Sequence, residues 1–448
     1  MQLVAYGAQD IYLTGNPQIT FFKVVYRRYT NFSMESIQQT WNGFTPTSDG
    51  RCTATISRNG DLVYKMYIQI ERHTTSASWV GCNPGANWIK NISVEIGGQT
   101  IDKQYGSWLE TWAELTEPNE IGARAMVNVS ASNSAAGDAQ ASTDFCTTLQ
   151  TRFQRMTGYG GVAPMVVDPT GIILSRGYQM AAGKHFYVPL QFWFNRNVGL
   201  SLPLIALQYH EVNIVLEHQF ASVWGAGGTG YGNPTQSLWA DYIYLDTDER
   251  RRFAQVSHEY LIEQLQMQTS IGNTIDLNFN HPVKELIWTG KWEMSAGSGF
   301  NQTLGTANVP GMGASSGTTL YQIKLNGQDR FAARPLTYFT KLQVQQYHTG
   351  PGGLNVQSAG TNDDGKLHFA ANASYSNQQA FNDSIAVYSF ALNPEEHQPS
   401  GTCNFSRIDT AQLVRTGAGD ANTTYNVYAV NYNVLRIMSG MGGLAYSN

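Results

Sequence analysis

The 448-residue sequence predicts an all-β protein with two tandem β-sandwiches of about eight strands each and short helices in the connections. Three observations support this fold class. The chain has 44 glycines and 12% aromatic residues but only 14% charged residues, a composition typical of short strands joined by many turns. Segments that alternate between apolar and polar residues are separated by turn signals. The same series of segments also occurs twice, which indicates a duplicated domain.

The first half contains several strand-like segments. Between Leu62 and Ile70 every second residue is apolar, so that one face of the strand is apolar, as a sandwich requires. Asn59-Gly60 and Gly97-Gly98 are strong signals for hairpins or other turns. We predict strands at Phe32–Trp41, Cys52–Ser57, Leu62–Ile70, Ile92–Ile96, Gln99–Lys103 and His185–Phe194, with Val212–His218 as the closing strand.

A helix is predicted directly after the second of these turns. Trp108, Leu109, Trp112 and Leu115 fall at helical spacing, and Pro118 lies beyond the expected end of the helix. Residues 116–184 are rich in glycine, alanine, serine and asparagine. We interpret them as a long insertion between strands, with one short helix within 144–156.

The second half repeats the series in the same order, at an offset of roughly 220–230 residues. A helical segment again follows the strands, from Pro335 to Tyr347, and Tyr425–Ile437 is expected to close the second unit. Eight antiparallel strands in two packed sheets form a jelly roll, which we therefore predict twice. The correspondences are His258–Gln266 with Phe32–Gln39, Asn273–Phe279 with Cys52–Ser57, Val283–Trp292 with Leu62–Ile70, Ile323–Arg330 with Val94–Ile101, and Tyr425–Ile437 with Val212–His218.

These correspondences predict an arm at 1–26, a first jelly roll at 27–220, a linker at 221–237 and a second jelly roll at 238–448. The linker contains Gly225–Gly230, which formally matches the GxGxxG pattern of dinucleotide sites. However, Gly232-Asn233-Pro234 follows and cannot open the helix that such a site needs.

The charge pattern argues against a nucleic-acid-binding chain. The net charge is −5, and the longest basic run, Arg250-Arg251-Arg252, follows three acidic residues between 246 and 249. We interpret that run as the charged start of a solvated helix. Because a polyanion-binding protein normally shows a basic stripe, we expect no direct contact with nucleic acid.

The cysteine pattern and the chain start favour a reducing compartment. Cys52, Cys82, Cys146 and Cys403 are widely spaced and form no CxxC pair, so we expect free thiols. The N-terminus lacks the features of a signal peptide, and no apolar run reaches about 18 residues. We expect the chain to be made and used on the cytosolic side of membranes.

The sequence gives little support for catalysis. His210-Glu211 and His258-Glu259 do not extend to HExxH, and neighbouring side chains on a strand face opposite ways, which disfavours a shared metal. Asp363-Asp364 lies in a glycine-rich loop and suits a solvated pair better than a glycosidase dyad. We expect no enzyme activity, no catalytic residues, no cofactor and no metal site.

Two alternatives from other functional classes stay open at this point. A jelly-roll lectin or adhesin would use tryptophan platforms for sugars, but most of the ten tryptophans fall on strand or helix faces, where core packing is favoured. A β-sandwich glycoside hydrolase would need two acidic side chains that face each other across a cleft. Neither alternative explains the duplication.

The opening stretch Gly7–Phe32 resembles the N-terminal signature of the major capsid proteins of large icosahedral double-stranded DNA viruses, the nucleocytoplasmic large DNA viruses, and the chlorovirus members above all. Gly15-Asn16-Pro17 forms a turn, and an apolar, aromatic segment with Lys23, Arg27 and Arg28 follows. Further similar blocks lie in both halves, whereas the long glycine- and serine-rich insertions do not match. These blocks are Leu202–Val212, Tyr244–Phe253, Ser257–Gln264 and Ser400–Asp409.

The resemblance implies two tandem jelly rolls per chain and a homotrimeric, pseudo-hexameric capsomer in an icosahedral virion shell that is assembled in the host cytoplasm. It implies contacts with neighbouring capsomers, with minor capsid and penton proteins, and with an internal viral membrane at the capsomer base. Some relatives carry glycans on outward loops. The candidate glycosylation sequons in this chain are Asn301, Asn372, Asn382, Asn404 and Asn422.

The arm at 1–26 is not needed to complete a sandwich, yet it carries Ile11, Leu13 and Ile19 among other apolar residues, too many to leave in water without a partner. We therefore expect the arm to dock at the capsomer base during assembly. The residues expected to take part are Asn16, Pro17, Phe21, Phe22, Arg27 and Arg28.

Overall fold

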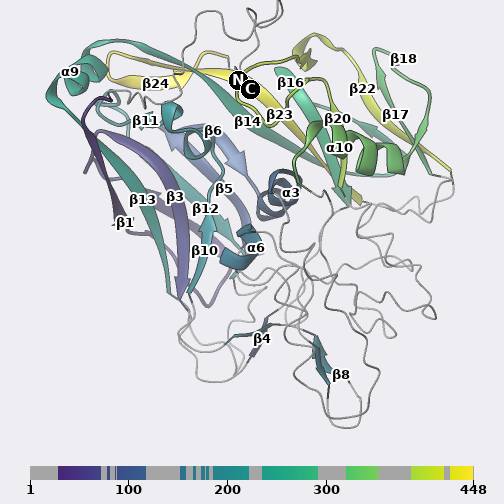
Figure 1. The fold of residues 1–448 in the computed structure, drawn as a ribbon, viewed down its shortest axis with the longest axis horizontal. Helices are drawn as coiled ribbons and strands as arrows, with labels where there is room; N and C mark the ends of the chain where they lie inside the picture. The colour runs from purple at the N-terminus through teal and green to yellow at the C-terminus, as the bar shows by residue number, and fades with distance from the viewer. Residues whose placement is uncertain are drawn as a thin grey trace, which may run out of the picture.

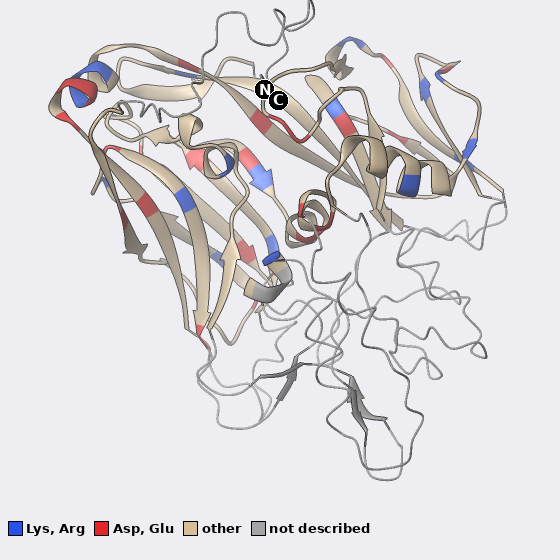
Figure 2. Ribbon diagram, in the orientation of Figure 1, with Lys and Arg blue, Asp and Glu red and all other residues tan. Residues whose placement is uncertain are grey.

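The computed structural model describes residues 29–71, 78–80, 86, 88–117, 152–157, 165–167, 173–176, 178–180, 185–220, 235–290, 319–350, 352, 385–417 and 424–446. These residues form antiparallel sheets and a few short helices, arranged as two sandwiches side by side (Figure 1). Lys and Arg lie interspersed with Asp and Glu over both sandwiches (Figure 2). In the described part of the chain, no helix is long and apolar enough to cross a membrane.

The first sandwich consists of two sheets. One sheet has the strand order β1-β13-β3-β10, with β11 attached to β3, and the other has the order β2-β12-β5-β6. The strands are β1 (Phe32–Gln39), β2 (Gly50–Thr55), β3 (Leu62–Glu71), β5 (Ile89–Ile96), β6 (Gln99–Gln104), β10 (His185–Pro189), β11 (Leu202–Pro203), β12 (Val212–His218) and β13 (Thr235–Leu245).

The second sandwich repeats this arrangement strand by strand. Its sheets have the orders β14-β23-β16-β20 and β15-β22-β17-β18, with β21, β24 and β19 as short additions. The two predicted jelly rolls are thereby confirmed. The strands are β14 (His258–Ile271), β15 (Thr274–Asp276), β16 (Pro282–Gly290), β17 (Leu320–Leu325), β18 (Gln328–Asp329), β19 (Arg334–Pro335), β20 (Ile385–Ser389), β21 (Cys403–Asn404), β22 (Ala411–Thr416), β23 (Thr424–Met438) and β24 (Met441–Leu444).

Short helices and two small sheets lie in the connections. The predicted helix after Gly97-Gly98 is present as α3 (Gly106–Thr116), and the run of arginines lies in α9 (Thr247–Gln255), where Arg250 forms an ion pair of 2.7 Å with Asp61. The other elements are α6 (Arg152–Met156), α7 (Trp193–Arg196), η1 (Val198–Leu200), η3 (Tyr338–Leu342), α10 (Gln343–Tyr347), η5 (Phe405–Arg407), and the strand pairs β4 (Ser78–Val80) with β9 (Tyr178–Met180) and β7 (Met165–Val167) with β8 (Ile173–Arg176).

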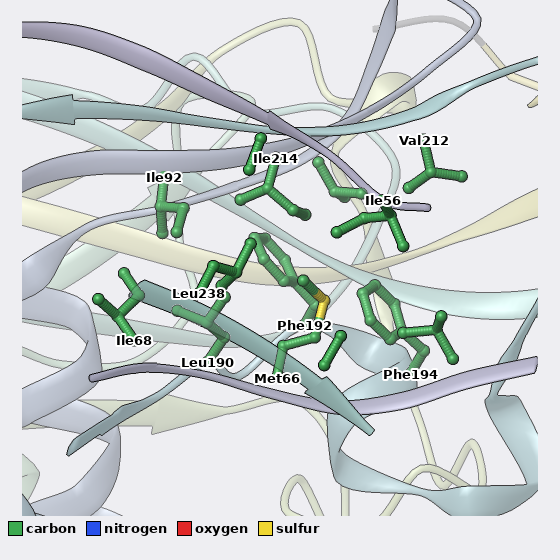
Figure 3. Close-up of a cluster of buried hydrophobic side chains, with 14 of the residues drawn as sticks. Ile56, Met66, Ile68, Ile92, Leu190, Phe192, Phe194, Val212, Ile214 and Leu238 are labelled. Carbon is green, nitrogen blue, oxygen red and sulfur yellow. The ribbon is translucent and has the colours of Figure 1, made fainter. Parts of the chain in front are cut away.

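Each sandwich has its own apolar core. In the first, Met66 and Ile68 of β3 point toward Ile92 of β5 and Ile214 of β12 in the opposite sheet, as period-two alternation requires (Figure 3). In the second, Trp288 of β16 takes the central place and is fully buried. The alternation seen in the sequence therefore identified the inward face of β3 correctly from Met66 to Ile70, whereas Val63 rather than Tyr64 enters the core at the start of the strand.

The strand pairing moves the domain boundary away from the sequence-based division. β13 lies between β1 and β3, so that Phe32 pairs with Leu245 and Tyr67 pairs with Trp239. Residues 238–245 consequently belong to the first sandwich, and the chain passes to the second at α9. Val212–His218 is not the closing strand but a central strand of the opposite sheet. Its counterpart is β22, and the counterpart of β23 is β13.

Two turn signals that look alike in the sequence have different roles. Gly97-Gly98 joins β5 to β6 in a hairpin, with φ angles of +58° and +84° that favour glycine. Asn59-Gly60, in contrast, lies between strands of different sheets and carries the chain from one sheet to the other. A Cβ atom at Gly60 would lie 2.8 Å from the Cβ atom of Tyr242, so this crossing requires glycine.

The predicted strand at His185–Phe194 is shorter than expected. It ends at Pro189, and Trp193 begins the short helix α7. Phe192, Trp193 and Phe194 are nevertheless buried in the first core. An apolar run of this length cannot be distinguished as strand or helix by periodicity alone.

Candidate functional site

The two sandwiches meet at a buried junction that is centred on α3. Trp108, Trp112 and Leu115 recur at the spacing of one helix face, while Leu109 points into the first core. This face packs on the outward face of the second sandwich, where the Trp108 ring lies 5.1 Å from that of Tyr428. α3 accordingly lies between the two sandwiches (Figure 1). The junction also contains Leu265, Ile287, Val344, Ile385, Val387 and Val430.

The second sandwich also caps the end of α3. The last carbonyl groups of a helix have no partner within the helix. Here the Gly350 N–H donates to the Leu115 carbonyl at 2.7 Å, and the Thr349 hydroxyl donates to the Thr116 carbonyl at 2.8 Å. A Cβ atom at Gly350 would lie 2.3 Å from the Glu114 carbonyl oxygen, so this close approach depends on glycine.

A buried cluster of charges crosses the junction at Glu263 of β14. Its carboxylate accepts from Lys284 of β16 at 2.7 Å and from Arg196 of α7, in the first sandwich, also at 2.7 Å. Burial alone raises the pKa of Glu263, but Arg196 and Lys284 outweigh it and hold that pKa well below its usual range. Burial lowers the pKa of Lys284, and Glu263 opposes this shift. The Arg196 guanidinium also lies 5.3 Å from the Trp112 ring.

A second buried charged group lies beside the segment that caps α3. His348 contacts Glu285 at 3.0 Å through Nε2 and Glu395 at 3.1 Å through Nδ1. Burial by itself lowers the pKa of His348, but the two carboxylates outweigh this effect and raise the pKa to about 9. The imidazole is therefore protonated at neutral pH, with both ring N–H groups donating to carboxylates.

A third polar contact joins β6 to β14. The Asp102 carboxylate accepts from the Leu265 N–H at 3.0 Å, and the Gln264 side chain donates to the Ile101 carbonyl. Burial raises the pKa of Asp102 to about 6. The edge of the first sandwich is thus tied to the backbone of the second by hydrogen bonds as well as by apolar contacts.

The arrangement at the junction suits a mechanical role. Within the described ranges, no group of three or more His, Cys, Asp or Glu side chains could hold a metal ion. A cavity of about 390 Å³ next to Arg196 is lined by polar side chains from both sandwiches, including Lys65, Gln191 and Glu395. At the junction, the Glu263 carboxylate neutralises Lys284 in its own sandwich and Arg196 in the other.

The His-Glu pairs considered in the sequence have structural roles. His210 contacts the backbone of Gly442 at 3.0 Å, and His258 contacts the Phe253 carbonyl at 2.8 Å. Glu259 forms an exposed ion pair with Arg436 at 2.8 Å. The Gly225–Gly230 pattern and Asp363-Asp364 lie outside the described residues.

The described cysteines are free thiols, and five of the described tryptophans are buried, whereas Trp41 and Trp239 are partly exposed. Burial raises the pKa of the Cys52 thiol to about 12, so this thiol is inert. Cys403 is also free, whereas Cys82 and Cys146 lie outside the described residues. Core packing is confirmed for the buried tryptophans, which are Trp88, Trp108, Trp112, Trp193 and Trp288.

Most of the other residues singled out in the sequence lie outside the described residues. Asn404 is the described member of the candidate glycosylation set. It is exposed, and its side-chain oxygen accepts from the Ser406 N–H at 3.1 Å. The residues outside the described part are Asn301, Asn372, Asn382 and Asn422, and the arm residues Asn16, Pro17, Phe21, Phe22, Arg27 and Arg28.

Sequence reasoning missed the buried charges of the junction. One signal was available, because Lys284-Glu285 interrupts an otherwise apolar strand between Val283 and Trp288. A charge within a buried strand needs a partner, but the sequence does not say that the partner of Lys284 is Glu263, nor that Arg196, from the other half of the chain, shares this carboxylate.

Comparisons with known proteins match the whole of this architecture. A family model described as major capsid protein N-terminus matches residues 20–246, and one described as large eukaryotic DNA virus major capsid protein matches residues 249–443. The two matches meet at α9, where the strand pairing also divides the chain. The major capsid protein of Pyramimonas orientalis virus is 47% identical, over 100% of this chain and 99% of that protein. That of Paramecium bursaria Chlorella virus 1 is 38% identical over the same shares.

Solved structures agree with these matches. The crystal structure of PBCV-1 VP54, fitted into a reconstruction of the virophage Sputnik, is 36% identical and superposes with a TM-score of 0.68. The match covers 96% of this chain and 100% of that chain. The Faustovirus major capsid protein, at 13% identity and a TM-score of 0.58 over 97% of this chain and 94% of that chain, shares the fold.

The substitution Glu263→Gln tests the buried charge cluster. It leaves Lys284, whose side chain is 0% exposed, without its closest counter-charge, and we expect a loss of about 3–5 kcal/mol in the free energy of unfolding. The matched control is Glu259→Gln on the same strand, which breaks an exposed pair and should cost about 0–1 kcal/mol. Urea unfolding followed by tryptophan fluorescence measures both. Equal losses in the two variants would contradict the role of the cluster.

The protonated imidazole at the junction predicts a pH dependence. Its folded-state pKa of about 9 lies above the value of about 6.5 expected in the unfolded chain. The contribution of His348 is therefore complete below pH about 6.5 and is lost as the pH rises through 9, with a total on the order of 3 kcal/mol. Thermal unfolding of the wild type and of His348→Gln should show a stability gap at pH about 7 that narrows by pH about 10. A gap that stays constant over this range would show that His348 is not charged in the folded protein.

Proposed function

The chain belongs to the major capsid protein family of large eukaryotic DNA viruses, and we propose that three copies of it form a homotrimeric capsomer with a pseudo-hexameric outline. Its role is structural. The protein is a component of the icosahedral virion shell and not an enzyme, as its relatives named major capsid protein indicate. A solved structure that is 36% identical to this chain belongs to a quasi-atomic model of the PBCV-1 virus capsid. This chain likewise assembles into a capsid with other capsomers.

The observation that carries the trimer proposal is the exact repetition of strand order in two sandwiches that share one buried junction. Three copies of such a chain supply six similar wedges. Six wedges in a ring fit a hexagonal arrangement of neighbours, whereas a single sandwich per chain would need six copies to do so. The duplication thus explains how a trimer can occupy a position with six neighbours.

Further partners are part of the same proposal. The capsomer contacts minor capsid and penton proteins at its edges, and its base faces these proteins or an internal viral membrane. Assembly takes place in the host cytoplasm, in agreement with free thiols at Cys52 and Cys403. The exposed sequon at Asn404 is a candidate attachment site for glycans.

The alternative of a jelly-roll carbohydrate-binding protein is not favoured. A sugar platform needs exposed tryptophan rings beside polar side chains in one loop cluster. Trp108, Trp112 and Trp288, in contrast, are buried in the junction and in the second core, and the partly exposed Trp239 lies on the face of β13 rather than in a loop cluster.

We also propose that the arm at 1–26 docks at the capsomer base and acts in shell assembly. β1 begins at Phe32, which pairs with Leu245 directly before α9, so the arm enters the sandwich at this end. A groove of about 590 Å³ lies at the same end, and exposed Tyr209, Val256 and Met438 are among the residues that line it. The exposed side chains of Tyr209, Val256 and Met438 offer contacts there for the apolar residues of the arm, within a lining that also contains glutamine and serine side chains.

The oligomeric mass tests the proposed capsomer. We expect the purified chain to elute as a particle of about three times its mass of 49.4 kDa, because permanent interfaces of this kind bury large areas. Multi-angle light scattering at micromolar concentration measures this mass. A stable monomer or dimer would count against the proposal.

Deletion of residues 1–26 tests the arm. The product should remain folded and trimer-sized, because β1 to β24 complete both sandwiches without it, but shell assembly should fail. Circular dichroism and light scattering check the first expectation, and electron microscopy of particles checks the second. A full-length chain with Phe21→Ser and Phe22→Ser should also fail to assemble, which would show that the apolar side chains of the arm, and not its length, are needed. If the deletion unfolds the protein, the arm is part of a core.

A further inference from the structure

One face of the first sandwich is exposed although its counterpart in the second sandwich is buried. The outward face of the sheet β14-β23-β16-β20 is covered by α3. The outward face of the equivalent sheet, β1-β13-β3-β10, carries no buried residue at the corresponding positions. The two faces can be compared position by position, because the strand pairing fixes which residues correspond.

The correspondence follows from two pairs of partners. Tyr67 of β3 pairs with Trp239 and with Pro189, just as Ile287 of β16 pairs with Tyr428 and with Val387. Ile287, Tyr428 and Val387 are fully buried in the junction beneath α3. Their counterparts Tyr67, Pro189 and Trp239 are all partly exposed.

The exposed face presents a row of aromatic rings across three strands. The rings of Tyr67 and Trp239 are stacked, with centroids 6.4 Å apart and planes at 6°. Tyr187 of β10, which is 38% exposed, contacts Tyr67 edge-on at 6.0 Å. Tyr and Trp are enriched at the centres of protein interfaces because they combine a large apolar surface with a polar group.

The second sandwich has a helix in the position of α3. α3 follows β6 in the first sandwich, and η3 with α10 follows β18 and β19 in the second. Phe339 of η3 points into the second core, as Leu109 of α3 points into the first. The outer side of the η3–α10 helix is exposed and carries Lys341, Leu342, Gln345 and Gln346, with Leu342 at 46% exposure.

We propose that the η3–α10 helix of one copy packs on the aromatic row of the next copy, so that the contact between copies repeats the contact that α3 makes within each chain. This inference rests on the proposed trimer and specifies its interface. The contact is head-to-tail, because the two surfaces differ, and such contacts close into a ring when the rotation between copies allows it. Junctions within chains and junctions between chains then alternate around the capsomer.

Substitutions on each side of the contact test the proposal. Trp239→Lys changes the sheet side and Leu342→Lys changes the helix side, and each should weaken trimer association at least about tenfold. Tyr209→Lys is the matched control, since Tyr209 is 76% exposed and lies at the groove near α9, away from both surfaces; it should leave the trimer intact. Light scattering over a dilution series measures the association.

Chemical crosslinking gives an independent measurement that does not disturb the aromatic row. Gln38 is exposed and its neighbour across the β1–β13 pair is Trp239, while Gln345 is exposed on the helix. In a background with the four native cysteines replaced by alanine, a chain with both Gln38→Cys and Gln345→Cys, treated with a short bis-maleimide, should yield covalent trimers. The single variants and the cysteine-free parent should stay monomeric on a denaturing gel.

The outcomes separate this inference from the trimer itself. A wild type that is monomeric or dimeric overturns the proposed capsomer. A trimeric wild type whose Trp239→Lys and Leu342→Lys variants remain trimeric, without crosslinking of the double cysteine variant, overturns only the assigned surfaces. Covalent dimers from either single cysteine variant would show a two-fold contact and overturn the head-to-tail arrangement. If Trp239→Lys fails to fold, Leu342→Lys and the crosslinking decide.

Discussion

The burial of one helix face, that of Trp108 and Trp112, on the sheet of the second sandwich fixes the shape of the whole protein. A buried tryptophan removes about 150–250 Å² from water, so the two together supply up to about 12 kcal/mol of hydrophobic free energy. Domains that meet through small polar surfaces move relative to each other by default. A shell component needs the opposite behaviour, because the angle between its two sandwiches determines whether neighbouring copies fit. The apolar face of α3 provides this rigidity.

The charges at the junction act on the arrangement rather than on the total stability. Removing two charges from water costs several kcal/mol each, and their attraction largely offsets this cost, so that the net gain from the Lys284–Glu263 pair is small. The contact that disfavours any other packing of the sandwiches is the one between Arg196 and Glu263, because a shift that separates them leaves a buried carboxylate short of counter-charge. His348, which pairs with Glu285 and Glu395 inside the second sandwich, holds in place the neighbouring segment that caps α3. Apolar side chains remain in contact when two surfaces slide past each other, whereas ion pairs and hydrogen bonds form in only one relative position of the two sandwiches.

The sequence was sufficient for the elements and insufficient for their long-range partners. Period-two alternation identified β3, the repeat of the first half identified β16, helical spacing identified α3, and Gly97-Gly98 identified the hairpin between β5 and β6. The sheet to which a strand belongs depends on partners far along the chain. Thr235–Leu245 carries its own alternation, yet only pairing with Phe32–Gln39 assigns it to the first sandwich. For the same reason the sequence showed Lys284 as an unusual residue but could not show that Arg196 shares its partner.

The two equivalent sheet faces differ in polarity: the face covered within the chain is the more apolar one, and the partly exposed face is the more polar one. The face beneath α3 is built from Ile287, Tyr428 and Val430, and it is covered as soon as the chain folds, since both surfaces belong to one molecule at a high effective concentration. The face with Tyr67 and Trp239 is in water until another copy arrives. A surface as apolar as the junction would promote aggregation of single copies during that time. Aromatic rings with polar neighbours, opposite a helix that carries Leu342 among glutamines, remain soluble and still supply contact area. The repeated sandwich therefore presents one sheet face in two versions: the version within the chain is apolar and covered by α3, and the other, to which we assign the contact between copies, is aromatic and partly exposed.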